Sequence, residues 1–75
     1  MEPELVGKRV MKLMEKHKIG IETLAIRMNL DVKILQDKLE GKEEFYLNEM
    51  IKIKDIFQLD TKSCDELFFS KDDRK

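Results

Sequence analysis

The chain has a single proline, Pro3, and its apolar residues recur at three- and four-residue steps with no segment of period two. Proline fixes φ and lacks a backbone N–H, so beyond the third residue no proline interrupts a helix. A spacing of three and four residues places apolar side chains along one face of a helix. The sequence therefore predicts an all-α fold, a compact bundle of four to five short helices with no sheet.

Glycine, asparagine and aspartate mark the expected helix ends. The predicted helices span residues 5–18, 21–28, 32–40, 48–57 and 62–69. Gly20 and Gly41 fall where the apolar periodicity breaks, as glycine does at helix boundaries. Asn29 tolerates a left-handed conformation and Asp31 accepts bonds from the next helix, so with Leu30 as an apolar plug they form a short turn. Residues 21–40 are therefore predicted to form a helix-turn-helix.

Seventy-five residues are enough for one small domain. We expect an N-terminal extension over residues 1–4, a single domain over 5–69 and a polar, frayed tail over 70–75. Gly7 lies inside the first helix at a cost of about 1 kcal/mol relative to alanine, which is tolerable near a helix end. The side chains predicted to face or anchor the core are Val6, Val10, Leu13, Leu24, Ala25, Met28, Leu35, Leu39, Phe45, Leu47, Met50, Ile53, Ile56, Phe57 and Leu59. Met11 and Met14 are left as candidates for a surface patch.

The net charge of −1 argues against a strongly basic nucleic-acid binder, but the total hides an asymmetry. Residues 5–42 contain nine basic and five acidic side chains, whereas residues 43–75 contain six basic and nine acidic ones. Such a split predicts one basic face and one acidic end. An ordinary solvated surface of lysine and glutamate gives the same counts, so charge alone leaves both interpretations open.

The composition also excludes several classes of protein. No apolar run approaches the roughly 20 residues that a membrane span requires, so we expect no membrane partner. The acidic start is unlike a secretion signal and a single cysteine excludes an internal disulfide, which favours a reducing, cytoplasmic location. One histidine and one cysteine offer neither a metal cluster nor an acid–base set, so we expect no enzyme, metal or cofactor. His17 is expected at the surface and Cys64 as an unpaired thiol.

The first half of the chain resembles a known family of DNA-binding domains. The residues that carry the resemblance are Val6–Leu13 (VGKRVMKL), Ile19, Leu24, Ala25, Leu30, Asp31, Leu35, Gly41 and Lys42. They are similar to the Cro/repressor-type helix-turn-helix domains of the xenobiotic-response-element family. Those domains have a basic first helix, a Leu-Ala pair in the second and a Gly-Lys ending to the third. The resemblance implies a lambda repressor-like fold.

The second half narrows the resemblance to small phage-type repressors of Gram-positive bacteria. Their pattern is Phe-Thr-x-x-Glu-Ile-x-x-Ile followed by a closing pair of phenylalanines. The matching residues here are Phe45–Met50 (FYLNEM), Ile53, Ile56, Phe57, Leu59 and Glu66–Phe69 (ELFF). The resemblance implies a sequence-specific transcription regulator, a repressor of phage or mobile-element type that binds a palindromic operator as a homodimer.

In that family the third helix lies in the major groove, where donor and acceptor patterns distinguish the base pairs. The resemblance assigns base reading to Val32, Lys33, Ile34, Gln36 and Asp37. It assigns phosphate contacts to Arg9, the amides around Ile21, Arg27, Lys38 and Lys42. The closing apolar residues Leu67, Phe68 and Phe69 are candidates for a dimer or partner contact, with at least one phenylalanine expected to pack in the core instead.

Several residues depart from the family pattern and keep a second hypothesis open. Gly20 and Ile21 replace the usual Thr-Gln at the start of the second helix, and Asp37 puts a carboxylate where phosphates lie. Val32 and Ile34 are apolar on the expected reading face, and Tyr46 in place of threonine predicts a broken capping box. The alternative is therefore a helix-turn-helix domain that has lost DNA binding and binds a protein, such as a repressor or another regulator.

Overall fold

The computed structural model describes residues 3–70, which form five α-helices and no strand. The helices are α1 (Pro3–His17), α2 (Ile21–Met28), α3 (Val32–Leu39), α4 (Leu47–Ile56) and α5 (Thr61–Phe69). The all-α prediction is confirmed, and the predicted helix ends differ from these by at most two residues. Helix α1 begins at Pro3, within the extension predicted over residues 1–4, and proline suits the first helical turn. Apart from Ser70, the predicted tail lies outside the described residues.

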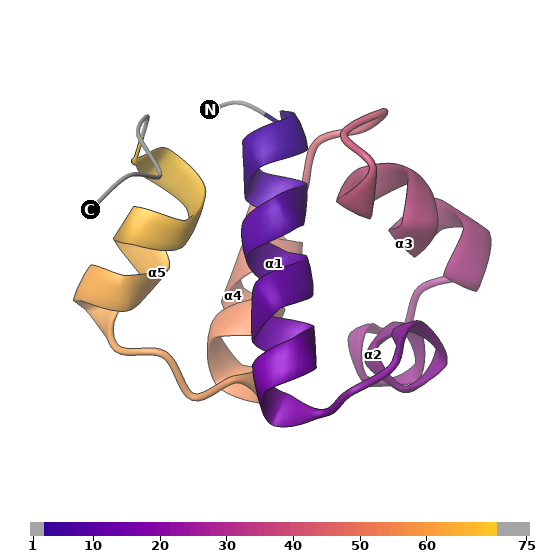
Figure 1. Cartoon of the computed structure of the whole chain (residues 1–75), viewed down its shortest axis with the longest axis horizontal. Coiled ribbons are helices and arrows are strands. Elements are labelled where there is room, and N and C mark those ends of the chain that lie inside the picture. The colour runs from indigo at the N-terminus through magenta and orange to yellow at the C-terminus, as the bar shows by residue number, and fades with distance from the viewer. Residues whose placement is uncertain (1–2, 71–75) are drawn as a thin grey trace.

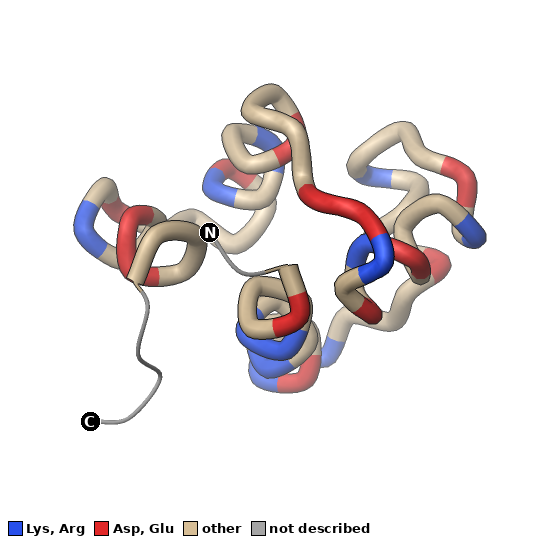
Figure 2. Tube along the Cα trace, turned by 90° about the horizontal axis from the view of Figure 1, so that it is seen from above, with Lys and Arg blue, Asp and Glu red and all other residues tan. Residues whose placement is uncertain are grey.

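Helix α1 stands at the centre of the bundle, with α5 on one side and α2 and α3 on the other (Figure 1). It packs against both α3 and α5, while α2 packs against α3 and α4. Helix α4 passes behind α1 in Figure 1, and the view from above shows it across the bundle from α1 (Figure 2). The α2–α3 pair therefore forms one edge of the bundle.

None of the helices within residues 3–70 has the length and apolar character needed to span a membrane.

Four of the helices end in the same way, with a residue in the left-handed conformation. These residues are Lys18, Asn29, Gly41 and Gln58. The next residue then donates its N–H to a carbonyl five positions back, as Leu30 does to Ala25 at 2.9 Å. This Schellman arrangement satisfies the last carbonyls of a helix and stops it. After α1, α2 and α4 that next residue is apolar and half-buried against the core: Ile19, Leu30 and Leu59. The predicted role of Leu30 as a plug is thus confirmed.

The core forms where the inward faces of the helices meet. Its buried apolar residues are Val6, Val10, Met14, Leu24, Ala25, Met28, Leu35, Leu39, Phe45, Met50, Ile53, Phe57, Leu67 and Phe68. Most predicted core positions are confirmed, but Leu47 is 70% exposed. Helix α4 begins at Leu47, so this residue lies on the outer side of the helix with Ile51 rather than in a loop beneath it. Of the two methionines predicted as candidates for a surface patch, Met14 is in the core and Met11 is exposed.

Gly7 is required by the packing of α1 against the end of α3. A Cβ atom at this position would lie 2.0 Å from the carbonyl oxygen of Leu39. Gly41 lies at the same junction with φ of 84°, and a Cβ there would meet Glu4. The two glycines let the backbones of α1 and of the α3 end approach directly. The helix-propensity cost expected for Gly7 is therefore offset by a contact that no other residue permits.

Candidate nucleic-acid interface

The predicted helix-turn-helix is present as two eight-residue helices joined by a three-residue turn. Asn29 ends α2 in the left-handed conformation, and Asp31 begins α3 by accepting a hydrogen bond from the N–H of Lys33 at 2.8 Å. Leu30 is half-buried between them. Local side-chain chemistry therefore fixes both ends of the turn, as the sequence indicates.

One side of α3 faces away from the core and defines the candidate interface. We call it the outer side of α3, formed by Val32, Lys33, Ile34, Gln36, Asp37 and Glu40. It includes all five predicted base-reading residues, of which four are exposed and Asp37 is half-buried. Its apolar members Val32 and Ile34 are 38% and 45% exposed. Polar groups and two partly covered apolar side chains thus share one accessible surface.

The polar groups on the outer side of α3 bind one another. The ammonium of Lys33 lies 3.1 Å from the carboxylate of Asp37, and the amide of Gln36 donates to Glu40 at 3.2 Å. Lys42, just beyond the helix, lies 3.2 Å from a second oxygen of Glu40. Positive and negative charges are therefore mixed on this surface, and the connection from α3 to α4 is acidic (Figure 2). These exposed pairs contribute little stability, about 0–1 kcal/mol each, and exchange partners readily.

Lys38, a predicted phosphate contact, is instead buried on the opposite side of α3. Its side chain is 1% exposed, and its ammonium lies 3.1 Å from the Glu49 carboxylate. It also donates to the carbonyl of Glu44 at 3.0 Å and lies 4.0 Å from the centre of the Tyr46 ring. Lys38 points inward because it lies on the same side of α3 as Leu35 and Leu39. The predicted phosphate contact is therefore wrong for Lys38, since its ammonium is buried and paired within the domain. The network joins α3 to the start of α4.

Glu49 also serves as the cap of α4. Its carboxylate accepts a hydrogen bond from the backbone N–H of Tyr46 at 2.8 Å. The sequence predicted a broken capping box, but one of its two hydrogen bonds is present. This bond forms because it uses the backbone N–H of residue 46 and does not depend on the side chain there. The Tyr46 ring covers Lys38 instead of capping the helix.

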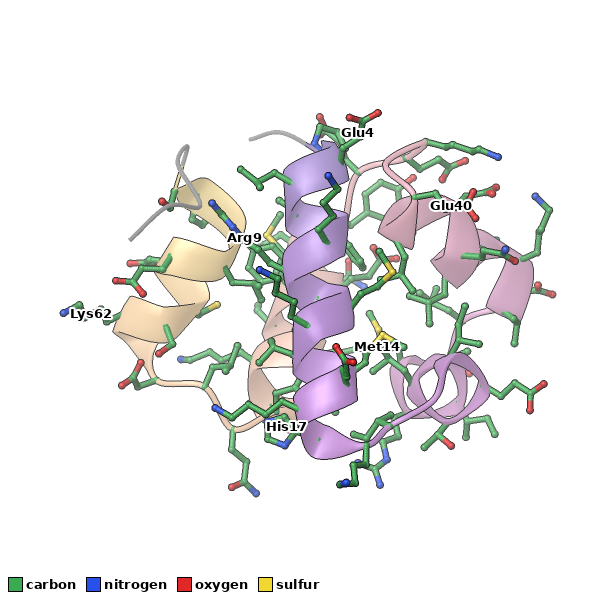
Figure 3. All side chains as sticks on the ribbon, in the orientation of Figure 1. Glu4, Arg9, Met14, His17, Glu40 and Lys62 are labelled. Atoms are coloured by element: carbon green, nitrogen blue, oxygen red, sulfur yellow. The ribbon has the colours of Figure 1, made fainter. Side chains whose placement is uncertain are left out.

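Arg9, the other buried member of the predicted phosphate set, closes the end of α5. Its guanidinium donates to the carbonyls of Glu66, Leu67 and Ser70 at 2.8, 3.0 and 2.9 Å. Figure 3 shows the side chain reaching from α1 toward the last turn of α5. The residue is only 8% exposed. Arg9 thus supplies the donors that the unsatisfied carbonyls of a helix end require, and a phosphate contact does not fit this position.

The start of α2 has backbone amides without a side-chain cap. Gly20 is its N-cap residue and makes no side-chain hydrogen bond, whereas Asp31 and Asp60 cap α3 and α5. The side chain of Ile21 is half-buried against the core, so only its backbone faces outward at this helix end. Arg27 is exposed on the same helix. Of the predicted phosphate set, the Ile21 amide, Arg27 and Lys42 therefore remain accessible.

The exposed apolar residues differ from those that the sequence indicated for a partner contact. Leu67 and Phe68 are buried, with the Phe68 ring edge-on to Phe45 at 6.2 Å, so only Phe69 of that set is exposed. Sequence reasoning missed a second group on α4, formed by Tyr46, Leu47 and Ile51. The sequence did contain a signal for this group. Leu47 and Ile51 are four residues apart and so share one side of the helix, which is not the side that carries the inward Met50 and Ile53.

Two titratable side chains outside the helix-turn-helix, Cys64 and Asp60, have shifted pKa values. No three His, Cys, Asp or Glu side chains of this part of the chain are placed to hold a metal ion. Burial raises the pKa of the half-buried Cys64 thiol. Hydrogen bonding from Ser63 lowers the pKa of Asp60, the cap of α5. Both shifts have local structural causes.

Comparisons of the chain with protein-family models, curated proteins and solved structures found no significant match. The class of this protein is therefore described from its fold alone. It is a small all-α bundle with a helix-turn-helix along one edge. The outer side of its second helix is accessible.

Proposed function

We propose that this chain is a sequence-specific DNA-binding transcription regulator, a repressor of phage or mobile-element type, which inserts α3 into the major groove. Binding to a palindromic operator as a homodimer is part of the proposal, as is a cytoplasmic location. The observation that carries it is the combination of an accessible outer side of α3 with the uncapped start of α2. Anions bind at helix N-termini because unsatisfied N–H groups point toward them.

The start of α2 suits a backbone phosphate for a specific reason. A side-chain cap would occupy its first amides, but Gly20 has no side chain, and the space where a Cβ would stand is open to at least 4 Å. Arg27 and Lys42 supply exposed positive charge on the helix-turn-helix and at the end of α3. In this proposal these groups hold the duplex without reading its sequence.

The outer side of α3 suits base reading once its pairs open. Gln36 matches adenine in a bidentate contact, and Lys33 matches guanine. Both are held by exposed partners, Glu40 and Asp37, whose bonds are weak enough to exchange for base edges. Asp37 accepts from a cytosine amino group, while Val32 and Ile34 cover thymine methyl groups. Lys38 and Glu49 support this by fixing α3 on the body of the domain.

Fluorescence anisotropy on a labelled random duplex at physiological ionic strength, about 0.15 M, tests the proposal. We expect a dissociation constant of about 1–100 μM, the usual range of non-specific binding. Gly20→Asp provides the site-specific variant, because aspartate is a good N-cap and its carboxylate occupies the amides that a phosphate needs. We expect this variant to fold at least as stably as the parent and to bind DNA about tenfold more weakly.

Thr61→Asp is the matched control, since it adds the same charge to the first turn of α5, on the other side of α1 (Figure 1). Its affinity should stay within about twofold of the parent at moderate salt, where distant charges are screened. An equal loss in both variants would assign the effect to net charge. No binding of the parent at about 100 μM would overturn the DNA proposal.

A protein-interaction module is the second candidate function, and one observation favours it. Together with Lys42, the outer side of α3 carries balanced, mutually paired charges and two apolar residues, whereas DNA-binding surfaces carry excess positive charge. Exposed Ile26, at 78%, and the α4 group of Tyr46, Leu47 and Ile51 add apolar surface. Under this alternative the chain binds a repressor or another regulator, and the parent shows no duplex binding in the anisotropy experiment.

A further inference from the structure

A cleft of about 440 Å³ opens between the C-terminal ends of α1 and α4 and one side of α2. Its volume is within the range of small-molecule sites, roughly 300–1,000 Å³. Ile19, Ile56 and Phe57 contribute apolar surface to its lining. None of the residues that form the outer side of α3 lines it, but Arg27, which we propose as a DNA phosphate contact, does, so the cleft adjoins the candidate nucleic-acid interface.

The polar lining of the cleft is basic. His17, Lys18 and Arg27 contribute to it with the neutral donors Thr23 and Gln58, and no carboxylate is among the lining residues. Within residues 3–70, neither Lys18 nor Arg27 forms an ion pair. The cleft therefore collects positive charge that has no protein partner in this part of the chain.

This distribution contrasts with that around α3. Lys33, Lys38 and Lys42 each pair with a carboxylate within 3.2 Å. Two unpaired cations that line one hollow provide the charge that an anionic ligand requires.

The helix ends beside the cleft do not cancel this charge. A helix C-terminus carries partial negative charge on its last carbonyls. Here the carbonyl of Met14 accepts from Ile19 at 2.8 Å, and that of Lys54 accepts from Leu59 at 2.9 Å. These Schellman bonds satisfy part of the carbonyl set at both ends.

The exposed imidazole of His17 contacts an aromatic ring at the cleft. Its ring lies 5.1 Å from the ring of Phe57, centre to centre, at an angle of 53°. Phe57 is buried, and Figure 3 shows His17 at the lower end of α1. The contact orients a hydrogen-bonding ring beside an apolar surface. A ligand with an anionic head and an apolar body matches both features.

We propose that this cleft binds a small organic molecule that carries a phosphate group. Lys18, Arg27 and His17 hold the phosphate, and the apolar body of the ligand rests on Ile19 and Ile56. A phosphate suits the site because it carries close to two negative charges and several acceptor oxygens, which match an arginine and a lysine. Occupancy ties α2 to the ends of α1 and α4, so the ligand stabilises the folded chain by mass action.

The test is a titration of the full chain with phenyl phosphate, followed through backbone amide NMR shifts. We expect saturable shifts at Ile19, Thr23 and Gln58, with a dissociation constant of roughly 5 mM for so small a probe. Phenol, which lacks the phosphate, should shift these amides much less at equal concentration. Arg27→Gln should weaken binding about tenfold because a charge-assisted contact is lost.

Lys8→Gln is the matched control, since it removes an exposed charge on α1 outside the cleft and should leave phenyl phosphate binding unchanged. No saturable shift up to about 50 mM phenyl phosphate would overturn the proposal, as would equal shifts with phenol. A DNA duplex distinguishes the source of the phosphate. Ile19 and Gln58 are the reporters in this competition, because Thr23 lies in the first turn of α2, where duplex is expected to shift the amides as well. Phenyl phosphate that still shifts these two amides when duplex is added supports a small-molecule site beside the DNA interface. Its displacement from these amides by duplex would assign the cleft to the DNA backbone and overturn the small-molecule assignment.

Discussion

The inner and outer sides of α3 both carry charged side chains, but the surroundings give those charges different roles. On the inner side, Lys38 is 1% exposed and is held by Glu49, the Glu44 carbonyl and the Tyr46 ring. On the outer side, Lys33 is paired with Asp37 over the same 3.1 Å, yet its side chain is 72% exposed. Equal distances thus correspond to a fixed structural link inside and to an exchangeable pair outside.

The comparison also separates the basic residues by role. Arg9 and Lys52, like Lys38, link one helix to another part of the fold. Arg9 donates to carbonyls at the end of α5, and the ammonium of Lys52 donates to the carbonyl of Met28 at the end of α2, at 3.0 Å. Arg27 and Lys42 lie at the surface. The basic count of the first half of the chain therefore overstates the charge available to a partner, because part of it holds the helices together.

The largest expected effect comes from breaking the inner link. Lys38→Met leaves the Glu49 carboxylate buried without its cation, and we expect a loss of about 3–5 kcal/mol in the free energy of unfolding. Lys33→Met, on the outer side, should change it by less than about 0.5 kcal/mol. Urea denaturation measures both. Adding Glu49→Gln to Lys38→Met should recover part of the loss, and equal stability of the two single variants would contradict the distinction.

Arg9→Met should have the next largest effect. It removes three hydrogen bonds to the end of α5, and we expect a loss of about 2 kcal/mol. The neighbouring Lys8 is exposed on α1, so Lys8→Met is the control and should be close to neutral. A thermal melt in which the Arg9 and Lys8 variants coincide would show that the guanidinium does not hold α5.

A pair of glycines extends the comparison from charge to packing. Gly7→Ala forces a methyl group against the Leu39 carbonyl, and we expect a net loss of about 1–3 kcal/mol despite the better helix propensity of alanine. Gly20→Ala meets no atom within 4 Å and should cost less than about 1 kcal/mol as a weaker N-cap. Chemical denaturation that ranks Gly20→Ala as the more damaging change would contradict the close contact between α1 and α3.

The smallest expected effect is at the exposed cap of α5. The pKa of Asp60 is lowered in the folded chain by the hydrogen bond from the Ser63 N–H, so its ionised form stabilises the fold. That contribution is complete above the unfolded pKa of about 3.9 and is lost as the pH falls through the lower folded value. The stability difference between the parent and Asp60→Asn should hold from pH 7 to about pH 5 and shrink below about pH 4. A difference that stays constant below that pH would exclude the carboxylate as its cause.

The fold could be predicted closely because periodicity and turn chemistry act locally. The ends of α2, the Asn29 turn and the Asp31 cap depend on neighbouring residues, and they are present as expected. The roles of Lys38 and Arg9 could not be predicted from composition, because a partner distant in sequence decides whether a cation is buried. The phase of Lys38 with Leu35 was the available signal, together with Glu49 beside the inward Met50. The prediction that Leu47 anchors the core was wrong, because the direction of its side chain depends on where α4 begins.

The most direct test of the central claim is an amide NMR titration of the chain with a DNA duplex at low salt. The account predicts that shifts concentrate at residues 21–23 and at Lys33, Gln36 and Asp37, and that the amides of α5 stay unchanged. Shifts confined to α4 and α5, or none with duplex near 100 μM, the weak limit of non-specific binding, would contradict the assignment of α3 to the major groove.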